Sequence, residues 1–86
     1  MKKIIKFYAN WCAPCKAYTP IFESATSEYK DQIEVISVNV DTDTDGIAST
    51  YKIRSIPSTV LVREDGSFLK KDGILTEETI KELILS

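Results

Sequence analysis

An almost unbroken apolar run opens the chain. Residues 2–8 read KKIIKFY, and Lys6 is the only charged residue between Ile4 and Tyr8. A strand with one face in water alternates apolar and polar residues, whereas a strand covered on both faces, as in parallel sheets, is apolar throughout. Residues 2–8 therefore predict a strand that is buried on both faces, so other elements must pack above and below it.

A helix is expected next, from about Pro14 to Lys30. Apolar residues recur there at steps of three and four, which gives the helix one apolar face. Pro20 lies inside this segment and should kink the helix, because its ring removes one backbone donor. The residues of the apolar face are Tyr18, Ile21, Phe22, Ala25 and Tyr29.

A second strand and a short helix are predicted in the middle of the chain. Residues 33–40 alternate and are rich in Val and Ile, which is typical of a strand. The polar loop 41–45 can cap a short helix that ends near Lys52.

The last third of the chain predicts a hairpin and a final helix. Strands at residues 58–63 and 68–71 flank the turn 64–67, whose Asp-Gly pair is a hairpin signal, so the two strands should be antiparallel. The helix is expected to begin after Thr76 as its N-cap, with acidic residues at its positive end. Its core-facing residues are Ile80, Leu83 and Ile84, with Leu75 packed against Ile80.

The predicted order is β-α-β-α-β-β-α, an α/β arrangement with a four-stranded mixed sheet and helices on both faces. The chain has 86 residues. At that size folding buries about 60% of the surface that the unfolded chain exposes, which leaves no room for a second core. We therefore expect a single domain over residues 1–86.

Composition excludes several classes of function. Eleven Lys and Arg against 13 Asp and Glu give a net charge of -2, and no basic cluster suited to nucleic acid or to an anionic membrane surface is present. The apolar runs are far shorter than the roughly 20 residues that span a bilayer. No cleavage site follows the basic start of the chain, so the expected location is the cytoplasm, and a monomer is expected. Histidine is absent, which excludes Ser-His-Asp and Cys-His catalysis.

Cys12 and Cys15 are the only cysteines. A structural zinc needs four ligands, so a zinc site would require two chains. A disulfide between Cys12 and Cys15 would stabilise the fold only weakly. Closing a ring of about four residues contributes roughly 2 kcal/mol to stability, against roughly 5 for a loop of about 100 residues. The spacing therefore favours a chemical role for the two cysteines over a structural one, and no bound metal is expected.

The cysteines lie where the first strand gives way to the first helix. The positive end of a helix favours a thiolate, which is the nucleophile in disulfide exchange, so Cys12 is the expected attacking residue. Cys15 follows one turn later on the same side, where it can attack a mixed disulfide on Cys12. Pro14 suits an early helical position, because no backbone donor is needed there.

One motif points elsewhere. Residues 41–46, DTDTDG, match the first half of a calcium-binding loop. The twelfth position of such a loop needs a bidentate carboxylate, and Lys52 stands there instead. A capping, solvated loop is therefore the preferred interpretation.

The chain resembles the thioredoxin family. Residues 7–16, FYANWCAPCK, resemble its active-site segment, with Ala13 where the family usually has Gly. Residues 54–59, RSIPST, resemble its second hallmark, an Ile followed by a cis-proline, here Pro57. Further matches are the helix-kinking Pro20, the acidic Asp41 at the end of a strand, and Gly73 near the active-site surface. The family's usual first strand and helix are missing, so the chain resembles a trimmed thioredoxin of glutaredoxin size. It lacks two features typical of glutaredoxins, namely their dipeptide between the cysteines and a Thr-Val pair before the cis-proline.

The resemblance implies a thioredoxin-like fold and a dithiol reductase of protein disulfides. The backbone of Ile56 would pair with an extended substrate peptide. The partners implied are disulfide-containing proteins and an electron donor such as a thioredoxin reductase, and no cofactor is needed beyond the cysteine pair. The implied apolar docking surface around Cys12 consists of Trp11, Ala13, Pro14, Ile56 and Gly73.

Two other functions remain open at this point. The same fold and motif support a disulfide oxidase or isomerase, although these need an oxidising space. A thioredoxin-like binding subunit without turnover is the alternative from another class, although it would not need both cysteines.

The sharpest departure from the resemblance is Lys6, which stands where most of the family has a buried aspartate. One interpretation is that Lys6 extends into water at the edge of the sheet, with its stem covering apolar surface. The other is that its amine lies near Cys15, where a cation would favour the thiolate and a neutral amine could accept the proton.

Overall fold

The elements of the computed structural model, which describes residues 1–86, follow the predicted order. A turn of 3-10 helix, η1, is the one addition. In chain order the elements are β1 (Lys2–Tyr8), α1 (Ala13–Thr26), η1 (Ser27–Tyr29), β2 (Ile33–Asn39), α2 (Ile47–Thr50), β3 (Ser58–Val62), β4 (Phe68–Asp72) and α3 (Glu77–Leu85).

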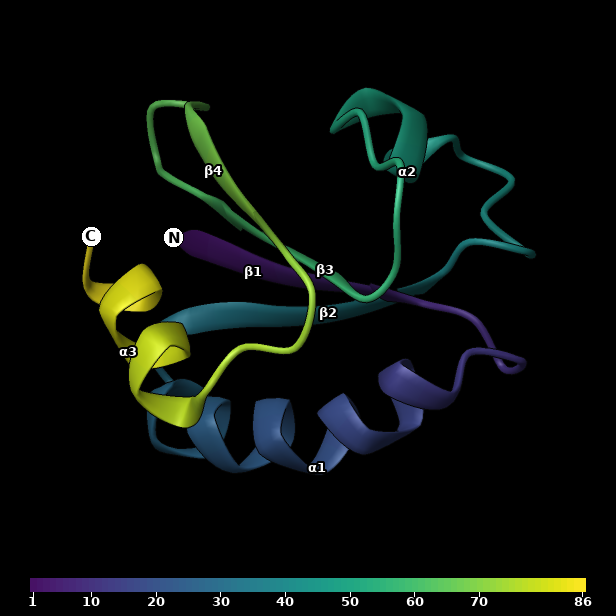
Figure 1. Ribbon diagram of the computed structural model, residues 1–86. Coiled ribbons are helices and arrows are strands. Elements are labelled where there is room, and N and C mark those ends of the chain that lie inside the picture. The colour runs from purple at the N-terminus through teal and green to yellow at the C-terminus, as the bar shows by residue number, and fades with distance from the viewer.

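The four strands form one mixed sheet in the order β2-β1-β3-β4 (Figure 1). β1 pairs in parallel with β2, from Lys2 opposite Ile33 to Tyr8 opposite Asn39. β3 is antiparallel to both β1 and β4, so the predicted hairpin is confirmed. The strand that the apolar run predicts thus lies in the interior of the sheet.

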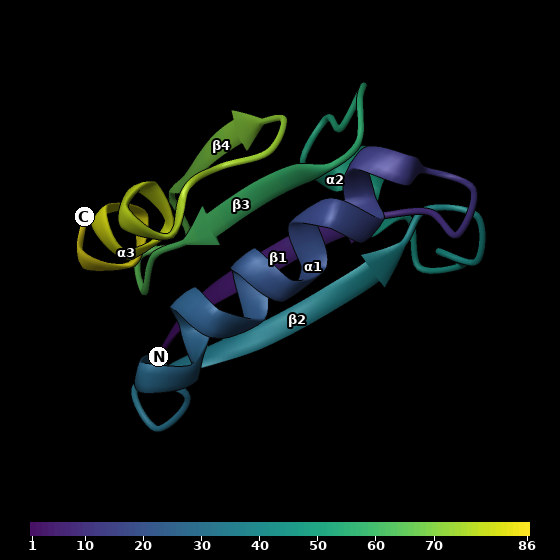
Figure 2. The same ribbon diagram turned by 60° about the horizontal axis from the view of Figure 1, so that its bottom comes forward.

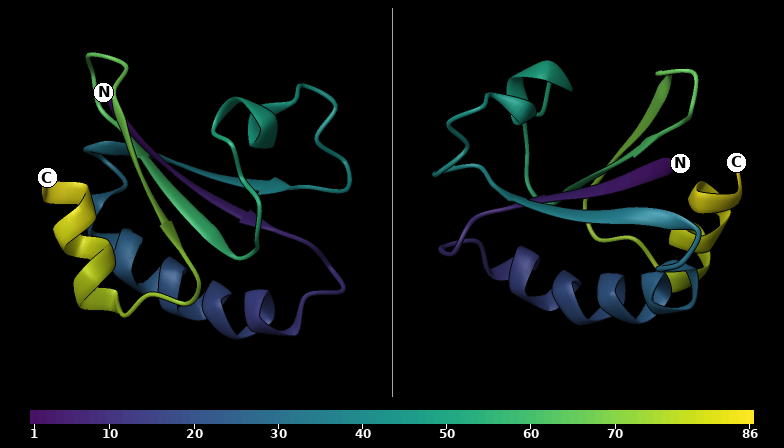
Figure 3. Two further views of the ribbon diagram at one scale, coloured as in Figure 1. Left: turned by 45° about the horizontal axis from the view of Figure 1, so that its top comes forward. Right: turned by 180° about the vertical axis from the view of Figure 1, so that it is seen from behind.

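Helices cover both faces of the sheet, as predicted. α1 and α3 lie on one face and α2 on the other (Figures 1 and 3), and Figure 2 shows α1 running along β1 and β2. Successive residues of β1 point to opposite faces, so Ile4 packs under α1 and α3 while Ile5 packs on the α2 side. The larger core comprises Ile4, Tyr18, Phe22, Ala25, Ile33, Leu61, Ile80, Leu83 and Ile84, and the smaller one Ile5, Phe7, Val38 and Val60.

Side-chain hydroxyls mark where α1 ends. The helix stops at Thr26 rather than near Lys30, and the chain continues as the tighter turn η1. The Thr26 hydroxyl donates to the Phe22 carbonyl at 2.9 Å, and the Ser27 hydroxyl to the Ser24 carbonyl at 2.9 Å. Such local bonds compete with regular helix geometry, which explains the earlier end.

Capping residues begin the other two helices. The carboxylate of Asp43 accepts from the backbone N–H groups of Ile47 at 3.0 Å and Ala48 at 2.7 Å, so α2 begins where the polar loop predicts a cap. Thr76 accepts from the N–H of Thr79 at 3.1 Å and is the N-cap of α3, as predicted.

The two ends of the chain lie close together, at the edge of the molecule where β1 begins (Figures 1 and 3). The amine of Lys2 donates to the carbonyl oxygens of Ile84 at 3.0 Å and Ser86 at 2.9 Å, which ties β1 to the end of α3. β1 runs from there to the opposite end of the sheet, where the cysteines lie. Among the helices, none combines the length and the apolar character that crossing a membrane requires.

Candidate active site

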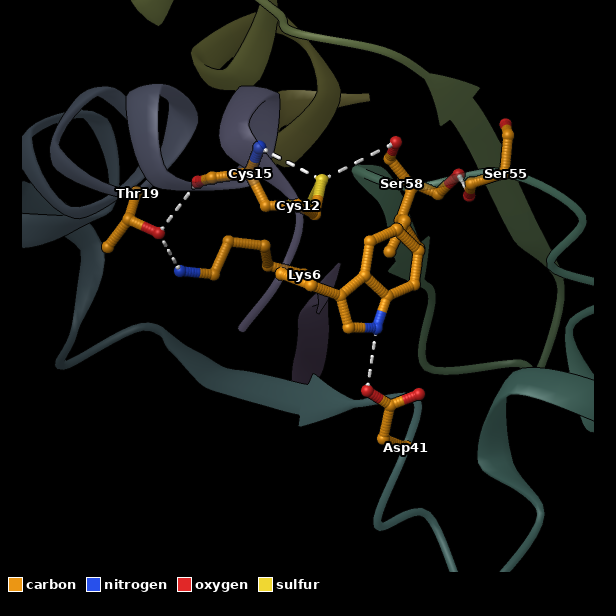
Figure 4. The surroundings of a disulfide bond; sticks show 9 residues. Lys6, Cys12, Cys15, Thr19, Asp41, Ser55 and Ser58 are labelled. Carbon is orange, nitrogen blue, oxygen red and sulfur yellow. Dashed lines mark hydrogen bonds between the residues drawn. A yellow bond between two sulfur atoms is a disulfide. The ribbon is translucent and has the colours of Figure 1, made fainter. Parts of the chain in front are cut away.

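A disulfide joins Cys12 and Cys15 at the start of α1, with 5.2 Å between their Cα atoms. Cys12 is the N-cap residue, in extended geometry, and its Sγ accepts a hydrogen bond from the backbone N–H of Cys15 at 3.2 Å (Figure 4). The predicted location at the N-terminal end of a helix is therefore confirmed. The sulfur thus pairs one of the backbone N–H groups that the start of a helix leaves without a partner.

Little of either cysteine meets solvent, with 4% of Cys12 and 1% of Cys15 exposed. They form a small cluster with the buried Ala9, and the partly buried Tyr8 and Ile56 pack against it. Pro14 is the second residue of α1, the early helical position that its missing donor predicts. The pair thus lies at the N-terminal turn of α1, and Cys12, the slightly more exposed of the two cysteines, is the N-cap residue.

The loop before β3 faces the cysteines. The Ile56-Pro57 peptide bond is cis, as the resemblance implies. The carbonyl oxygen of Ile56 lies 3.9 Å from Cys12 Sγ, and the N–H of Gly73 donates to the carbonyl of Pro57 at 2.8 Å. The hydroxyl of Ser58, on the first residue of β3, lies 2.7 Å from the Ser55 carbonyl and 3.0 Å from the Asp72 carboxylate. These contacts fasten the loop to the end of β4 and place its backbone beside Cys12 Sγ.

The side chain of Trp11 is 71% exposed and does not cover the core. Its indole N–H donates to the carboxylate of Asp41 at 2.8 Å (Figure 4). Trp11 and Ile56 line one groove of about 220 Å³. Ala13 and Pro14 are exposed on the first turn of α1, while Gly73 is half-buried beside Pro57. The structure thus brings the five residues of the predicted docking surface to the same end of the sheet.

The side chain of Lys6 is buried, which contradicts the first of the two interpretations given for it. β1 is an interior strand and only 4% of Lys6 is exposed, so the prediction of an amine extending into water at the sheet edge is wrong. Lys6 Nζ donates to the Thr19 hydroxyl at 2.9 Å, and that hydroxyl donates to the carbonyl of Cys15 at 3.0 Å (Figure 4). Burial lowers the pKa of the Lys6 amine, and the nearby Glu23 carboxylate opposes that shift.

Sequence reasoning missed three features of the site. Thr19 connects Lys6 to Cys15, and its place four residues after Cys15 puts it on the same helical face. Asp41 orients Trp11 across 30 residues of chain, which no local pattern indicates. Ile74, which directly follows Gly73, is an apolar side chain that is 50% exposed.

No group of three or more His, Cys, Asp and Glu side chains comes together anywhere in the chain to hold a metal ion. In the loop that resembles half of a calcium site, both oxygens of Asp43 accept from the N–H groups that begin α2. The capping interpretation of that loop is confirmed.

Comparison with known proteins decides the family. The thioredoxin family profile matches residues 1–86. The chain belongs to the thioredoxin family. It is 43% identical to thioredoxin of Mycoplasmoides gallisepticum over 84 residues, which are 96% of this chain and 81% of that protein. It is 37% identical to thioredoxin of Borreliella burgdorferi over 81 residues, 94% of this chain and 68% of that protein. Among solved structures, chloroplastic thioredoxin z superposes with a TM-score of 0.82 at 26% identity, covering 98% of this chain and 75% of that one.

Membership of the thioredoxin family gives the cysteine pair its chemistry. The protein is a thiol–disulfide oxidoreductase, of the class that reduces protein disulfides. Thioredoxins need no cofactor besides this redox-active disulfide, since the two sulfurs carry both electrons. The family also implies disulfide-containing substrates and a reductase as electron donor.

Proposed function

We propose that Cys12 is the attacking cysteine and Cys15 the resolving one in the reduction of protein disulfides. The observation that carries this assignment is the hydrogen bond from the Cys15 N–H to Cys12 Sγ at the helix N-terminus, because the same N–H would stabilise a Cys12 thiolate in the reduced enzyme.

The reaction then has two steps. The Cys12 thiolate attacks one substrate sulfur, and the other substrate sulfur leaves as a thiolate, so that a mixed disulfide joins Cys12 to the substrate. Cys15, as a thiolate, attacks Cys12 Sγ, the Cys12–substrate bond breaks, and the second substrate sulfur leaves. The substrate gains two electrons and takes two protons from solvent, and the enzyme is left with the Cys12–Cys15 disulfide.

The proposed substrate surface extends from Trp11 to the Ile56-Pro57 loop. The carbonyl oxygen of Ile56, 3.9 Å from Cys12 Sγ, is available to an extended peptide whose disulfide lies on that sulfur. Pro57 supports the site by holding Ile56 against the cysteines. The apolar side chains of Trp11, Ala13, Pro14 and Ile56 and the backbone at Gly73 would exclude water from the exchanging sulfurs.

The enzyme also needs an electron donor and a reducing compartment. The enzyme returns to its dithiol form by accepting two electrons from a separate protein, a thioredoxin reductase or a donor of the same kind. It acts in the cytoplasm, where thiols are kept reduced, and it acts as a monomer, because one chain supplies both cysteines.

Reduction of insulin by dithiothreitol tests the function. Wild-type protein should accelerate insulin reduction above dithiothreitol alone, Cys12→Ser should abolish that acceleration, and Cys15→Ser should be trapped as a mixed disulfide that mass spectrometry detects. Alkylation of the reduced protein should occur first at Cys12. A rate with wild-type protein equal to that of dithiothreitol alone would refute the enzymatic function and favour a binding subunit. Faster alkylation at Cys15 than at Cys12 would reverse the roles assigned to the two cysteines.

A further inference from the structure

Lys6 is a buried cation behind the active site, and nothing in the mechanism above uses it. Only 4% of the residue is exposed, and its amine has one hydrogen-bond acceptor, the hydroxyl of Thr19 at 2.9 Å. Burying an isolated ammonium is costly, and contacts with the amine offset part of that cost. Two features do so.

Aromatic rings supply the first feature. Lys6 Nζ lies 5.3 Å from the centroid of the Tyr8 ring and 5.5 Å from that of Phe22, within the range of a cation–π attraction. Tyr8 also packs against the cluster that contains Cys12 and Cys15. The Tyr8 side chain is therefore a common neighbour of the Lys6 ammonium and of the cysteine pair.

Thr19 supplies the second feature. Its hydroxyl accepts from Lys6 and donates to the Cys15 carbonyl at 3.0 Å, so a single hydroxyl separates the ammonium from the backbone of Cys15. This chain of bonds fixes the cation beside Thr19, one helical turn after Cys15. The charge therefore lies close to the backbone of Cys15, on the buried side of α1.

Other charged groups face the same space. Lys6 lines a groove of about 580 Å³ between α1 and β2, and the charged residues around it are Glu23, Lys30 and Glu34. The amino group of Met1, also at this groove, is paired with Glu64 at 3.6 Å. The hydroxyl of Tyr18, on α1, is bonded to Thr59 on β3. Of these groups, the Glu23 carboxylate favours the charged amine and partly opposes the lowering of the Lys6 pKa by burial. Lys6 is the only buried residue of the chain that carries a charge.

We infer that the Lys6 ammonium, anchored by Thr19, favours the thiolate of Cys15 in the reduced enzyme and thereby speeds the step in which Cys15 displaces the substrate from Cys12. Lys6 and Thr19 are positioning residues, since they act through Cys15 and touch no substrate. The proton that Cys15 loses passes to solvent, and the inference rests on the proposed function for the identity of the resolving step.

The first test isolates Cys15. In a Cys12→Ser background, the rate of iodoacetamide alkylation is measured from pH 5 to 10 with Lys6, with Lys6→Met and with Thr19→Val. Lys6→Met should move the profile to higher pH and slow alkylation about tenfold on its acidic side, as expected for loss of one nearby charge at an effective dielectric constant of about 20. Thr19→Val, which leaves the amine but removes its anchor, should change the profile in the same direction by about threefold.

The second test resolves the two steps in the enzyme with both cysteines. Single-turnover reduction of a disulfide peptide should show that Lys6→Met slows release of the mixed disulfide about tenfold at pH 6 to 7, while attack by Cys12 changes by less than about twofold. The two enzymes should converge at high pH, where Cys15 ionises without help. Lys3→Met is the matched control, because Lys3 is an exposed lysine on the same strand.

Three results would overturn the inference. They are an unchanged Cys15 alkylation profile in Lys6→Met, equal slowing of both steps at every pH, and an equal effect of Lys3→Met. If Lys6→Met does not fold, an unchanged profile in Thr19→Val has the same meaning. A wild-type protein that fails to reduce insulin but shows the Lys6-dependent profile would refute the proposed function and leave the effect of Lys6 on Cys15 in place.

Discussion

Replacing Lys6 by Met should make the oxidised protein more stable at neutral pH. The methionine side chain is similar in length and can pack against the rings of Tyr8 and Phe22, whereas the native residue is only 4% exposed and its amine has one hydrogen-bond acceptor. The Thr19 hydroxyl keeps the Cys15 carbonyl as its acceptor, so the substitution leaves no buried donor unpaired.

The expected magnitude follows from opposing contributions. Burying an ammonium costs several kcal/mol. Its bond to Thr19 returns about 1.5 to 3 kcal/mol and the two aromatic contacts about 0.5 to 1 each, which nearly offsets that cost. Burial of the thioether gains apolar transfer energy without a charge penalty. We therefore expect Lys6→Met to be about 1 kcal/mol more stable, a rise in Tm of roughly 4–8 °C for a domain of this size.

The stability difference between Lys6→Met and wild type should depend on pH. Burial lowers the pKa of Lys6 below 10.5, so above the folded-state pKa the unfolded chain binds more protons than the folded one. The penalty of the buried charge is complete below the folded-state pKa and is relieved as the pH rises toward 10.5. The advantage of Lys6→Met should therefore shrink at alkaline pH.

Urea unfolding of the oxidised proteins at pH 7 and pH 10 measures both quantities, because subtracting wild type from variant removes the titration of all other groups. Lys3→Met, at an exposed position of the same strand, should change the free energy of unfolding by less than about 0.5 kcal/mol. A Lys6→Met protein that is less stable by 1 kcal/mol or more, equally at both pH values, would refute this reasoning, since the polar contacts of the amine would then outweigh its burial.

Two further substitutions test contacts elsewhere. Tyr18→Phe removes the 2.7 Å bond to Thr59 and should cost about 1 kcal/mol at pH 7. Because burial raises the pKa of Tyr18 to about 12, the unfolded chain loses this proton first, and wild-type stability should fall between pH 10 and 12 more steeply than that of Tyr18→Phe. Urea unfolding at pH 8 and 11 checks both statements, and equal slopes would contradict the second. Asp41→Ala frees the indole of Trp11 and should raise the KM for insulin about fivefold with kcat and Tm little changed, the equivalent of about 1 kcal/mol. Asp45→Ala, an exposed change in the same loop, is its control, and an unchanged KM in Asp41→Ala would show that Trp11 needs no anchor.

The elements of this fold could be predicted because each is encoded locally. The apolar run of β1, the helical spacing of Tyr18, Phe22 and Ala25, and the Thr76 cap each indicate one element without reference to the rest. The order of the strands is not local. It depends on which strands pair across the whole chain, and for this reason the burial of Lys6 could not be deduced from its neighbours.

The active site likewise combines features that are encoded locally with contacts that depend on long-range packing. The positions of Cys12 and Cys15 follow from the junction of strand and helix, and the resemblance supplied the cis bond before Pro57. The contact of Trp11 with Asp41 and the chain from Lys6 through Thr19 to Cys15 join residues whose partners are set only by the packing of α1 and the β2–α2 loop against the sheet.

The unequal covering of the two sheet faces has a dynamic consequence. α1 is held by a nine-residue core, whereas α2 is a single turn over four buried residues. Segments with few buried contacts open at lower free energy than the rest of a protein. The segment from α2 to Arg54 is therefore expected to fluctuate most, while the Ser55–Pro57 loop stays fastened to β4, so the groove between Trp11 and Ile56 can change its width on the α2 side while the cysteine pair and the Ile56 backbone keep their places.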